Sequence, residues 1–317
     1  MRILITGITG FAGGHLASLC REHADEVHGL VRPGREAAAP DGVTVHAAVL
    51  TEPGSVGAAL AAAAPDTVVH LAGASSVGQS FAEPLETWEA NLGGTLGVLE
   101  ALRREAPEVR CVVVSSGEVY GRVDPAGLPV GPDTPLRPLS PYGASKAAAD
   151  LAGAQYRAGY GMPAVRVRAF NQIGPGHDAR FVLPNVARQI ARAEAAGRTE
   201  LEIRVGNVDT RRDFTDVRDM VRAYRLLAQR GDLDAVYLAC SGRSLSVKEL
   251  VDGLVELTPI DAVVRSDPRR RREGEQPDLY GSADRLAADT GWAPRIPLRT
   301  TLSDTLDWWR RKVAEEE

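Results

Sequence analysis

Short runs of β-branched residues alternate with Ala- and Leu-rich stretches along most of this chain, and that alternation is its strongest constraint on the fold. The apolar runs predict strands at 3–6, 26–31, 43–47, 67–72, 109–115, 164–169 and 235–238. Helical periodicity lies between them, at 13–23, 55–64, 84–105, 142–159, 183–196 and 216–230. Strands that alternate with helices predict right-handed βαβ units and an α/β fold, a doubly wound parallel sheet with helices on both faces.

Gly7, Gly10 and Gly13 follow the first strand at the spacing GxxGxxG, in the stretch RILITGITGFAGGHLA. Glycine adopts positive φ angles, and its missing side chain lets a pyrophosphate approach the backbone N–H groups. The helix that starts near Gly13 can point its N-terminus at the phosphates. A glycine-rich turn can be merely structural, but its position at the first strand–helix junction predicts a dinucleotide site.

The residues after the second strand indicate which dinucleotide binds. An acidic residue there would bond the ribose 2′-hydroxyl and favour NAD. This chain instead has Arg32 and Arg35, and a guanidinium suits a 2′-phosphate because its contact is bidentate and charge-assisted. NADP(H) is therefore favoured and NAD(H) stays open, since two plain surface arginines would look the same.

Beyond residue 171 the alternation loosens, and loops rich in Gly, Pro and Arg occur at 172–180, 204–213 and 265–278. We expect a smaller C-terminal α/β lobe here, built from separate insertions over the carboxyl edge of the sheet. The expected division is a dinucleotide-binding domain at 1–171, with segments returning near 213–241 and 277–290, and a lobe in 172–317 that mainly binds substrate.

Ser116 and Glu118 follow the buried run VVV at 112–114, at the end of a strand where ligands bind in open α/β sheets. Tyr142 and Lys146 are four residues apart and share one face of a helix. An ammonium nearby, together with an oxidised nicotinamide, would pull the tyrosine pKa from about 10 towards neutrality. Tyr142 could then exchange a proton with a substrate oxygen that Ser116 also bonds, and Lys146 could hold the nicotinamide ribose.

Composition excludes several functional classes. A net charge of −5 argues against a nucleic-acid or anionic-membrane partner, and no apolar stretch is long enough to cross a bilayer. Met1 leads directly into a strand-like run rather than a secretory signal. The three Cys and six His lack metal-ligand spacing, so we expect no metal site and a cytoplasmic chain with reduced thiols.

The stretches TGITGFAG, HLAGASSVG, VVVSSGEVYG and SPYGASK resemble the extended short-chain dehydrogenase/reductases that act on nucleotide sugars. The resemblance covers essentially the whole chain and implies a Rossmann-like sheet with a substrate lobe. RAFNQIGPG, RFVLPNVARQIA and VGNVDTRRDFTDVRDMVRAY are similar to the branch that handles GDP-linked sugars, which contains 4-keto-6-deoxy-mannose reductases and mannose 4,6-dehydratases. Taken together, these stretches are more similar to the sequences of the reductases than to those of the dehydratases.

The resemblance implies NADP(H)-dependent hydride transfer at sugar C4 of a GDP-4-keto-6-deoxyhexose, with Ser116, Tyr142 and Lys146 as the catalytic triad. It implies that the pyrophosphate is lined by Gly7, Thr9, Gly10, Phe11, Ala12 and Gly13, and that Leu71, Ala72 and Gly73 approach the cofactor. It places substrate-binding residues at Ser116, Asn171, Arg180, Arg204, Arg212 and Arg272, where guanidinium groups would match a nucleotide diphosphate.

Glu118 keeps other reactions open. In 4,6-dehydratases a carboxylate at this place removes the C5 proton, whereas in a reductase it would be a bystander or a hydrogen-bond acceptor. A dehydratase is therefore the alternative to the reductase, followed by a C4-epimerase and by a non-catalytic dinucleotide-binding sensor. Relatives of this kind pair the helices equivalent to 84–105 and 142–159 across a twofold axis, which implies a homodimer through a four-helix bundle.

Overall fold

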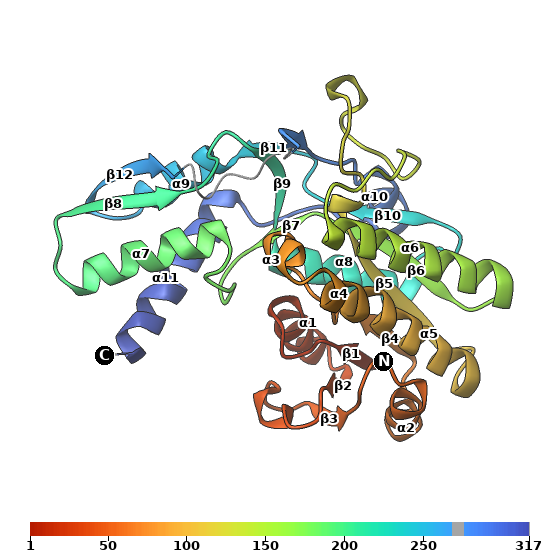
Figure 1. Ribbon diagram of the computed structural model, residues 1–317. Helices are drawn as coiled ribbons and strands as arrows, with labels where there is room; N and C mark the ends of the chain where they lie inside the picture. Colours follow the sequence, from red (N-terminus) through yellow and green to blue (C-terminus); the bar gives the residue numbers. More distant parts are fainter. Residues whose placement is uncertain (268–275, 317) are drawn as a thin grey trace.

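A seven-stranded, entirely parallel sheet forms the centre of the computed structural model, which describes residues 1–267 and 276–316 (Figure 1). Its strand order is β10-β6-β5-β4-β1-β2-β3. The strands are β1 (Arg2–Thr6), β2 (Glu26–Val31), β3 (Thr44–Ala47), β4 (Thr67–His70), β5 (Arg110–Ser116), β6 (Ala164–Ala169) and β10 (Val236–Ala239). They are the strands that the sequence predicts, with ends shifted by two residues at most. The predicted doubly wound α/β fold is confirmed.

Helices cover both faces of this sheet, because side chains that alternate along β1 enter two different cores. Ile3 and Ile5 pack with residues of α1 (Phe11–Glu22) and α8 (Val217–Arg230). Leu4 packs on the opposite face, with residues of α2 (Pro53–Ala63), α5 (Gly94–Glu105) and α6 (Pro141–Tyr160). A strand buried on both faces needs apolar residues at every position, as ILI provides.

The strand order reverses between β1 and β4, and this switch point positions the candidate site. β1, β2 and β3 run outward on one side of it, and β4, β5 and β6 on the other. In open α/β sheets, ligands bind at the carboxyl ends of the strands beside such a reversal. The glycine turn after β1 and the loop after β4 both lie at that edge.

A second, smaller set of elements forms the lobe at the left of Figure 1. It contains a four-stranded sheet of β7 (Asn171–Ile173), β9 (Arg211–Asp216), β11 (Ser244–Ser246) and β13 (Asp278–Leu279), and a pair of β8 (Glu200–Val205) with β12 (Asp261–Ser266). The helices α7 (Val182–Ala195), α9 (Val247–Val255) and α11 (Leu298–Glu316) pack on one another around a separate apolar core. The sequence predicted α7 but none of these lobe strands, nor α9 and α11.

The remaining helices are short, namely α3 (Val77–Ala82), α4 (Pro84–Trp88) and α10 (Asp284–Thr290). A π-helical turn, η2 (Glu89–Gly93), joins α4 to α5, so the single helix predicted at 84–105 is interrupted. The 3₁₀ turns are η1 (Glu36–Ala38), η3 (Gly117–Val119) and η4 (Pro125–Gly127). No helix within the described part of the chain has the length and apolar character needed to span a membrane.

Candidate active site

The turn between β1 and α1 is closed so tightly that side chains are excluded from it. Gly7 has a φ of +69°, and a Cβ there would lie 2.8 Å from the Cα of Ala72. A Cβ on Gly13 would lie 2.2 Å from the carbonyl oxygen of Gly7. Gly10 is the N-cap of α1 and supplies no side-chain bond to the first N–H groups of the helix. Those N–H groups lack intrahelical partners, so the turn offers free donors to an anion.

The loop after β4 is fixed against this turn. The Thr6 hydroxyl pairs with Nδ1 of His70 at 2.8 Å and accepts a hydrogen bond from the backbone N–H of Ala72 at 3.1 Å. The other His70 nitrogen contacts the Thr95 hydroxyl, and burial lowers the pKa of His70 to about 3, so the ring is neutral. Leu71 and Ala72 are thereby held against Gly7, and Gly73 follows them in the same loop; their approach to the cofactor stays a prediction.

These residues fit a dinucleotide. The crevice floor is backbone without Cβ atoms, the helix N-terminus is uncapped, and Arg32 lies exposed directly after β2. Thr9 and Gly10 are also exposed, whereas Phe11 and Ala12 are half-buried. The turn would hold the pyrophosphate and Arg32 would meet a 2′-phosphate. Bound there, the nicotinamide supplies or accepts a hydride.

Ser116 and Tyr142 meet at the carboxyl end of β5. Ser116 is the last residue of the strand, and its hydroxyl accepts a hydrogen bond from the Glu118 backbone N–H at 3.2 Å. Tyr142 stands in the first turn of α6, which the Ser140 side chain caps by accepting from the Gly143 N–H. The Ser116 and Tyr142 side chains lie close enough for the serine hydroxyl to lower the pKa of the phenol, so segments far apart in the sequence form one group.

Burial raises the pKa of Tyr142 to about 12; the Ser116 hydrogen bond lowers it and the Glu118 charge raises it, both to a smaller extent. The sequence led us to expect a value pulled towards neutrality by Lys146 together with an oxidised nicotinamide. The groups of the chain alone do not produce that shift, because the Lys146 ammonium donates to the carbonyl oxygen of Val114. Tyr142 is therefore a neutral phenol at physiological pH, able to give a proton.

Lys146 lies one turn after Tyr142 and is buried. Burial lowers its pKa to about 8, and the carboxylate of Asp150, a further turn along α6, opposes this shift. Asp150 in turn bonds Arg168 of β6 at 2.8 Å. A buried network thus lies beside the ammonium, which donates to the carbonyl oxygen of Val114, two residues before Ser116.

Glu118 lies in the turn after Ser116 and forms an ion pair with Arg212 of β9, with 3.6 Å between Oε1 and Nε. Arg212 is buried and also donates to the carbonyl oxygens of Arg211 and Gln276 at 2.8 Å. This pair joins the sheet domain to the lobe at the mouth of the site. It brings one predicted substrate residue within reach of the catalytic group.

The other predicted substrate residues are more dispersed. Asn171 is exposed at the start of β7, and Arg180 is exposed in the following loop, where it contacts Asp178 and Gln79. Arg204 lies on β8, which Figure 1 places well away from β5, and pairs with Glu202 at 2.7 Å. Arg272 lies outside the described residues.

Asn91 is a site residue that sequence reasoning missed. It lies in the π-helical turn η2 and is buried, with its amide nitrogen donating to the Ser145 hydroxyl at 2.9 Å. Its Oδ1 is buried without a hydrogen-bond partner among the described residues, 2.4 Å from where a Cβ on Gly73 would lie. The signal was a polar residue before two glycines, NLGG, inside an otherwise helical stretch; π-bulges are frequent at functional sites.

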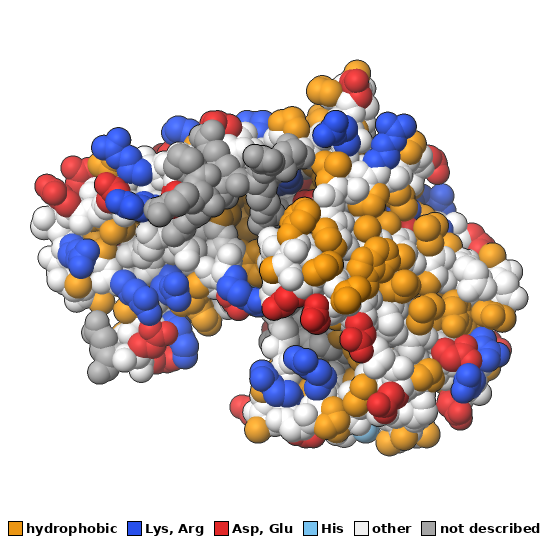
Figure 2. Space-filling view, viewed as in Figure 1, with side chains coloured by type: hydrophobic (Ala, Val, Ile, Leu, Met, Phe, Trp, Pro, Cys, Tyr) orange, Lys and Arg blue, Asp and Glu red, His pale blue; other side chains and the backbone are white. Residues whose placement is uncertain are grey.

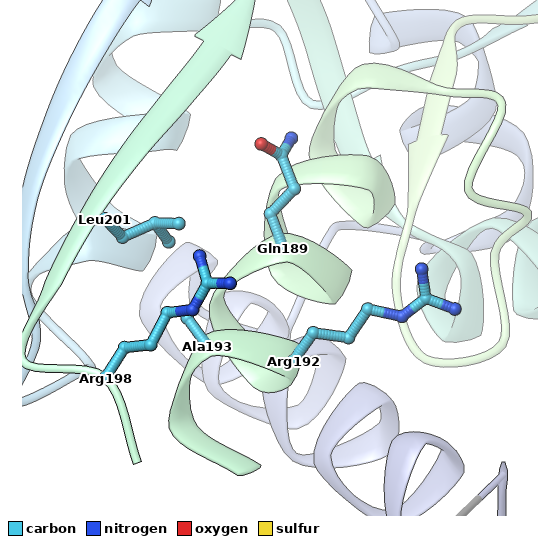
Figure 3. A pocket seen from close by; sticks show the side chains of 5 residues that line it. All are labelled: Gln189, Arg192, Ala193, Arg198 and Leu201. Carbon is cyan, nitrogen blue, oxygen red and sulfur yellow. The ribbon is translucent and has the colours of Figure 1, made fainter. Parts of the chain in front are cut away.

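A separate surface pocket of about 220 Å³ lies between α7 and β8 (Figure 3). It is lined by Gln189, Arg192, Ala193, Arg198 and Leu201. None of these residues belongs to the group at β5, and α7 and β8 lie in the lobe at the far left of Figure 1. The described residues also contain no cluster of His, Cys, Asp and Glu suited to a metal ion.

Comparison with known proteins agrees with this geometry. Residues 4–305 match the family described as GDP-mannose 4,6 dehydratase. The chain belongs to this family. It is 37% identical over 316 residues to the GDP-6-deoxy-D-mannose reductase of Pseudomonas aeruginosa, with 99% of both chains covered. The predicted membership of the extended short-chain dehydrogenase/reductases, an enzyme family, is confirmed.

Solved structures of the family have the same fold. RMD from Pseudomonas aeruginosa, complexed with NADPH, superposes with a TM-score of 0.84 at 34% identity and 98% coverage of both chains. UDP-glucose 4-epimerase of Thermus thermophilus, complexed with NAD, gives 0.86 at 29% identity, covering 98% of this chain and 99% of the other. The solved structures similar to this chain thus include a complex with NADPH and an epimerase complexed with NAD.

Proposed function

We propose that this chain is an NADP(H)-dependent nucleotide-sugar reductase that converts the C4 ketone of a GDP-4-keto-6-deoxyhexose into a hydroxyl. The observation that carries the proposal is the grouping of Ser116, Tyr142 and Lys146 at the end of β5, next to the glycine turn. Likeness over nearly the full length to a GDP-6-deoxy-D-mannose reductase supports the substrate class, and likeness to a complex with NADPH supports the cofactor.

The protonation state of Tyr142 favours reduction. Hydride addition to a ketone leaves an alkoxide, which needs a proton. Because burial raises the pKa of Tyr142 to about 12, the phenol holds its proton and can donate it to that oxygen. The Ser116 hydroxyl can hydrogen-bond the same oxygen, and its interaction with Tyr142 also favours the phenolate that remains.

The contact between Glu118 and Arg212 weighs against the dehydratase alternative. A 4,6-dehydratase needs a carboxylate that accepts the C5 proton, and Glu118 is the candidate. Its carboxylate is already engaged by a buried guanidinium 3.6 Å away. This ion pair orients the Glu118 carboxylate towards Arg212 of the lobe. A substrate acceptor role suits Glu118 better.

A substrate panel tests the proposal. Purified protein with NADPH should oxidise the cofactor when given GDP-4-keto-6-deoxymannose, and the product should be a GDP-6-deoxyhexose by NMR. GDP-mannose with NADP⁺ should give no 4-keto sugar. Dehydration of GDP-mannose without ketone reduction would contradict the proposal in favour of the dehydratase, and a cofactor retained through purification with C4 inversion would favour an epimerase.

We further propose a homodimer in which α5 and α6 of two copies form a four-helix bundle. Large apolar side chains are exposed over α3 to α6, where Figure 2 shows a contiguous orange area. Leu85, Phe81 and Leu151 are 78%, 58% and 57% exposed, which is unusual for solvent-facing leucine and phenylalanine that gather in one place. Leu151→Glu should yield a monomer by light scattering, whereas Val263→Glu, at an exposed apolar residue in the lobe, should not; a monomeric wild type contradicts the dimer.

The division at residue 171 and the cytoplasmic location stay proposals. The first is supported by α8 and β10, which return from beyond residue 171 to the central sheet. The second is supported by three cysteines that are all buried and unpaired, as expected in a reducing compartment.

A further inference from the structure

The loop from residue 174 to 181, here called the strap, leaves the lobe and returns to it. It connects β7 to α7, so both its ends belong to lobe elements. Its middle instead contacts the sheet domain. Gly176, with a φ of +85°, allows one of the bends in its course.

The strap contacts α1, the helix that follows the glycine turn. Nε2 of His15 lies 2.9 Å from the carbonyl oxygen of Pro175, and since a carbonyl only accepts, this nitrogen carries the proton. The ring of His177 stacks on Phe11, the first residue of α1, with centroids 4.2 Å apart and planes 9° from parallel. Phe11 was expected to line the pyrophosphate; its ring contacts the strap.

His177 is held from both sides. Phe181 stacks on its other face with centroids 4.4 Å apart, so the three rings form a continuous column from α1 to the start of α7. Burial lowers the pKa of His177 to about 4, and the ring is therefore uncharged at neutral pH. Its Nδ1 is buried without a hydrogen-bond partner among the described residues, which indicates that stacking holds this ring.

The far end of the strap reaches the opposite rim of the crevice. Arg180 donates to the side-chain oxygen of Gln79 on α3 at 3.2 Å. α1 follows the turn after β1 and α3 follows the loop after β4, so the strap bridges the two rims of the switch point.

We propose that the Phe11–His177–Phe181 column makes His177 a positioning residue that couples dinucleotide binding at the glycine turn to nucleotide-sugar binding in the lobe. The inference rests on the proposed function, because it takes the crevice as the NADP(H) site and the lobe as the GDP-sugar site. When the strap is packed against α1, it holds β7 and α7 in place for the sugar nucleotide. A dinucleotide that stabilises α1 and its turn favours this packed position of the strap.

The first experiment measures the dissociation constant of NADPH with and without saturating GDP, by NADPH fluorescence. In the wild type GDP should tighten NADPH about tenfold, and NADPH should tighten GDP by the same factor because binding linkage is reciprocal. His177→Ala should reduce the factor to about two or less, whereas His177→Phe, which keeps a flat ring between Phe11 and Phe181, should retain most of it. His46→Ala, which removes a stacked histidine pair on β2 and β3, is the matched control and should keep the full factor.

The second experiment uses no ligand. Trypsin should cut after Arg180 slowly in the wild type and, in His177→Ala, about tenfold faster relative to the exposed Arg198, which lies beyond α7 and serves as the internal reference. The phenylalanine variant should resemble the wild type. An unchanged cleavage ratio, or a coupling factor that survives His177→Ala, overturns the inference. Failure of the wild type to bind NADPH or GDP would count against the proposed function instead, and the cleavage ratio would still decide the role of the column.

Discussion

The glycine turn and the end of β5 face the same crevice but are built in opposite ways. The turn works by leaving side chains out: Gly7, Gly13 and Gly73 stand where a Cβ would collide with backbone or with Asn91. The end of β5 works by what its side chains contribute, a hydroxyl, a phenol and an ammonium that are partly or fully buried. The glycine turn should therefore be disrupted when a side-chain atom is added. The end of β5 should lose activity or affinity when a side-chain atom or a proton is removed.

The largest effect should come from removing one oxygen at β5. Tyr142→Phe deletes the acid that protonates the substrate oxygen, so kcat for ketone reduction should fall by about 10³-fold. NADPH affinity should change by about twofold or less, because the ring remains. Tyr160→Phe, at an exposed tyrosine on the same helix, should leave kcat unchanged. Retention of a tenth of the activity in Tyr142→Phe would mean that another group supplies the proton.

Adding one carbon at the turn should have the next largest effect. A Cβ at Gly13 meets the Gly7 carbonyl oxygen at 2.2 Å, and backbone cannot move aside cheaply. Gly13→Ala should lower the free energy of unfolding by about 2 kcal/mol, measured by urea denaturation. Gly14→Ala adds the same carbon one residue later on α1, where nothing lies within 4 Å, and should instead stabilise by about 0.5 kcal/mol. Equal effects of the two substitutions would show that the turn is not constrained by packing.

The two regions also differ in how far the sequence could predict them. GxxGxxG, the strand end at Ser116 and the Tyr142–Lys146 spacing are local patterns, and each was placed from neighbouring residues alone. The Glu118–Arg212 pair joins segments far apart in the chain, so no local pattern marks it. The NLGG pattern marks Asn91 but does not reveal its contact with Gly73. The pKa of Tyr142 is raised by the groups of the chain alone because burial is a property of packing, which spacing does not reveal.

The lobe shows the same limit more strongly. β9 carries the polar sequence RRDFTD, yet four of its polar residues are buried, and neighbouring segments supply hydrogen-bond partners to Arg212, Asp213 and Asp216. Asp213, for example, accepts hydrogen bonds from Ser241 and Gly242. A strand of this composition lacks the apolar run by which the central sheet was predicted.

The preference for NADPH over NADH tests whether a residue outside the glycine turn recognises the 2′-phosphate while the turn recognises only the pyrophosphate. Arg32 lies beyond the turn, exposed after β2, and should contact the 2′-phosphate that distinguishes NADPH from NADH. Arg32→Ala should weaken NADPH by about tenfold, the loss of one charge-assisted hydrogen bond, and leave NADH affinity unchanged. NADH is thus the internal control. A parallel loss for both cofactors would place Arg32 at the shared part of the dinucleotide.

The smallest expected effect is a pH dependence of NADPH binding. It should come from the end of β5, since the glycine turn itself contains no titrating group. Burial lowers the pKa of Lys146 to about 8, so its charge is present below that value and is lost as the pH rises through it. If the ammonium helps to hold the nicotinamide ribose, the dissociation constant of NADPH should rise about fourfold between pH 7 and 8.5, in step with the deprotonated fraction. Lys146→Met should bind more weakly at pH 7 but show no such rise, because only the uncharged turn and Arg32 then remain. Lys248→Met, at an exposed lysine paired with Asp252, should keep the wild-type pH dependence. If the dissociation constant of NADPH still rises with pH in Lys146→Met, the titration belongs to another group and the ribose contact loses its support.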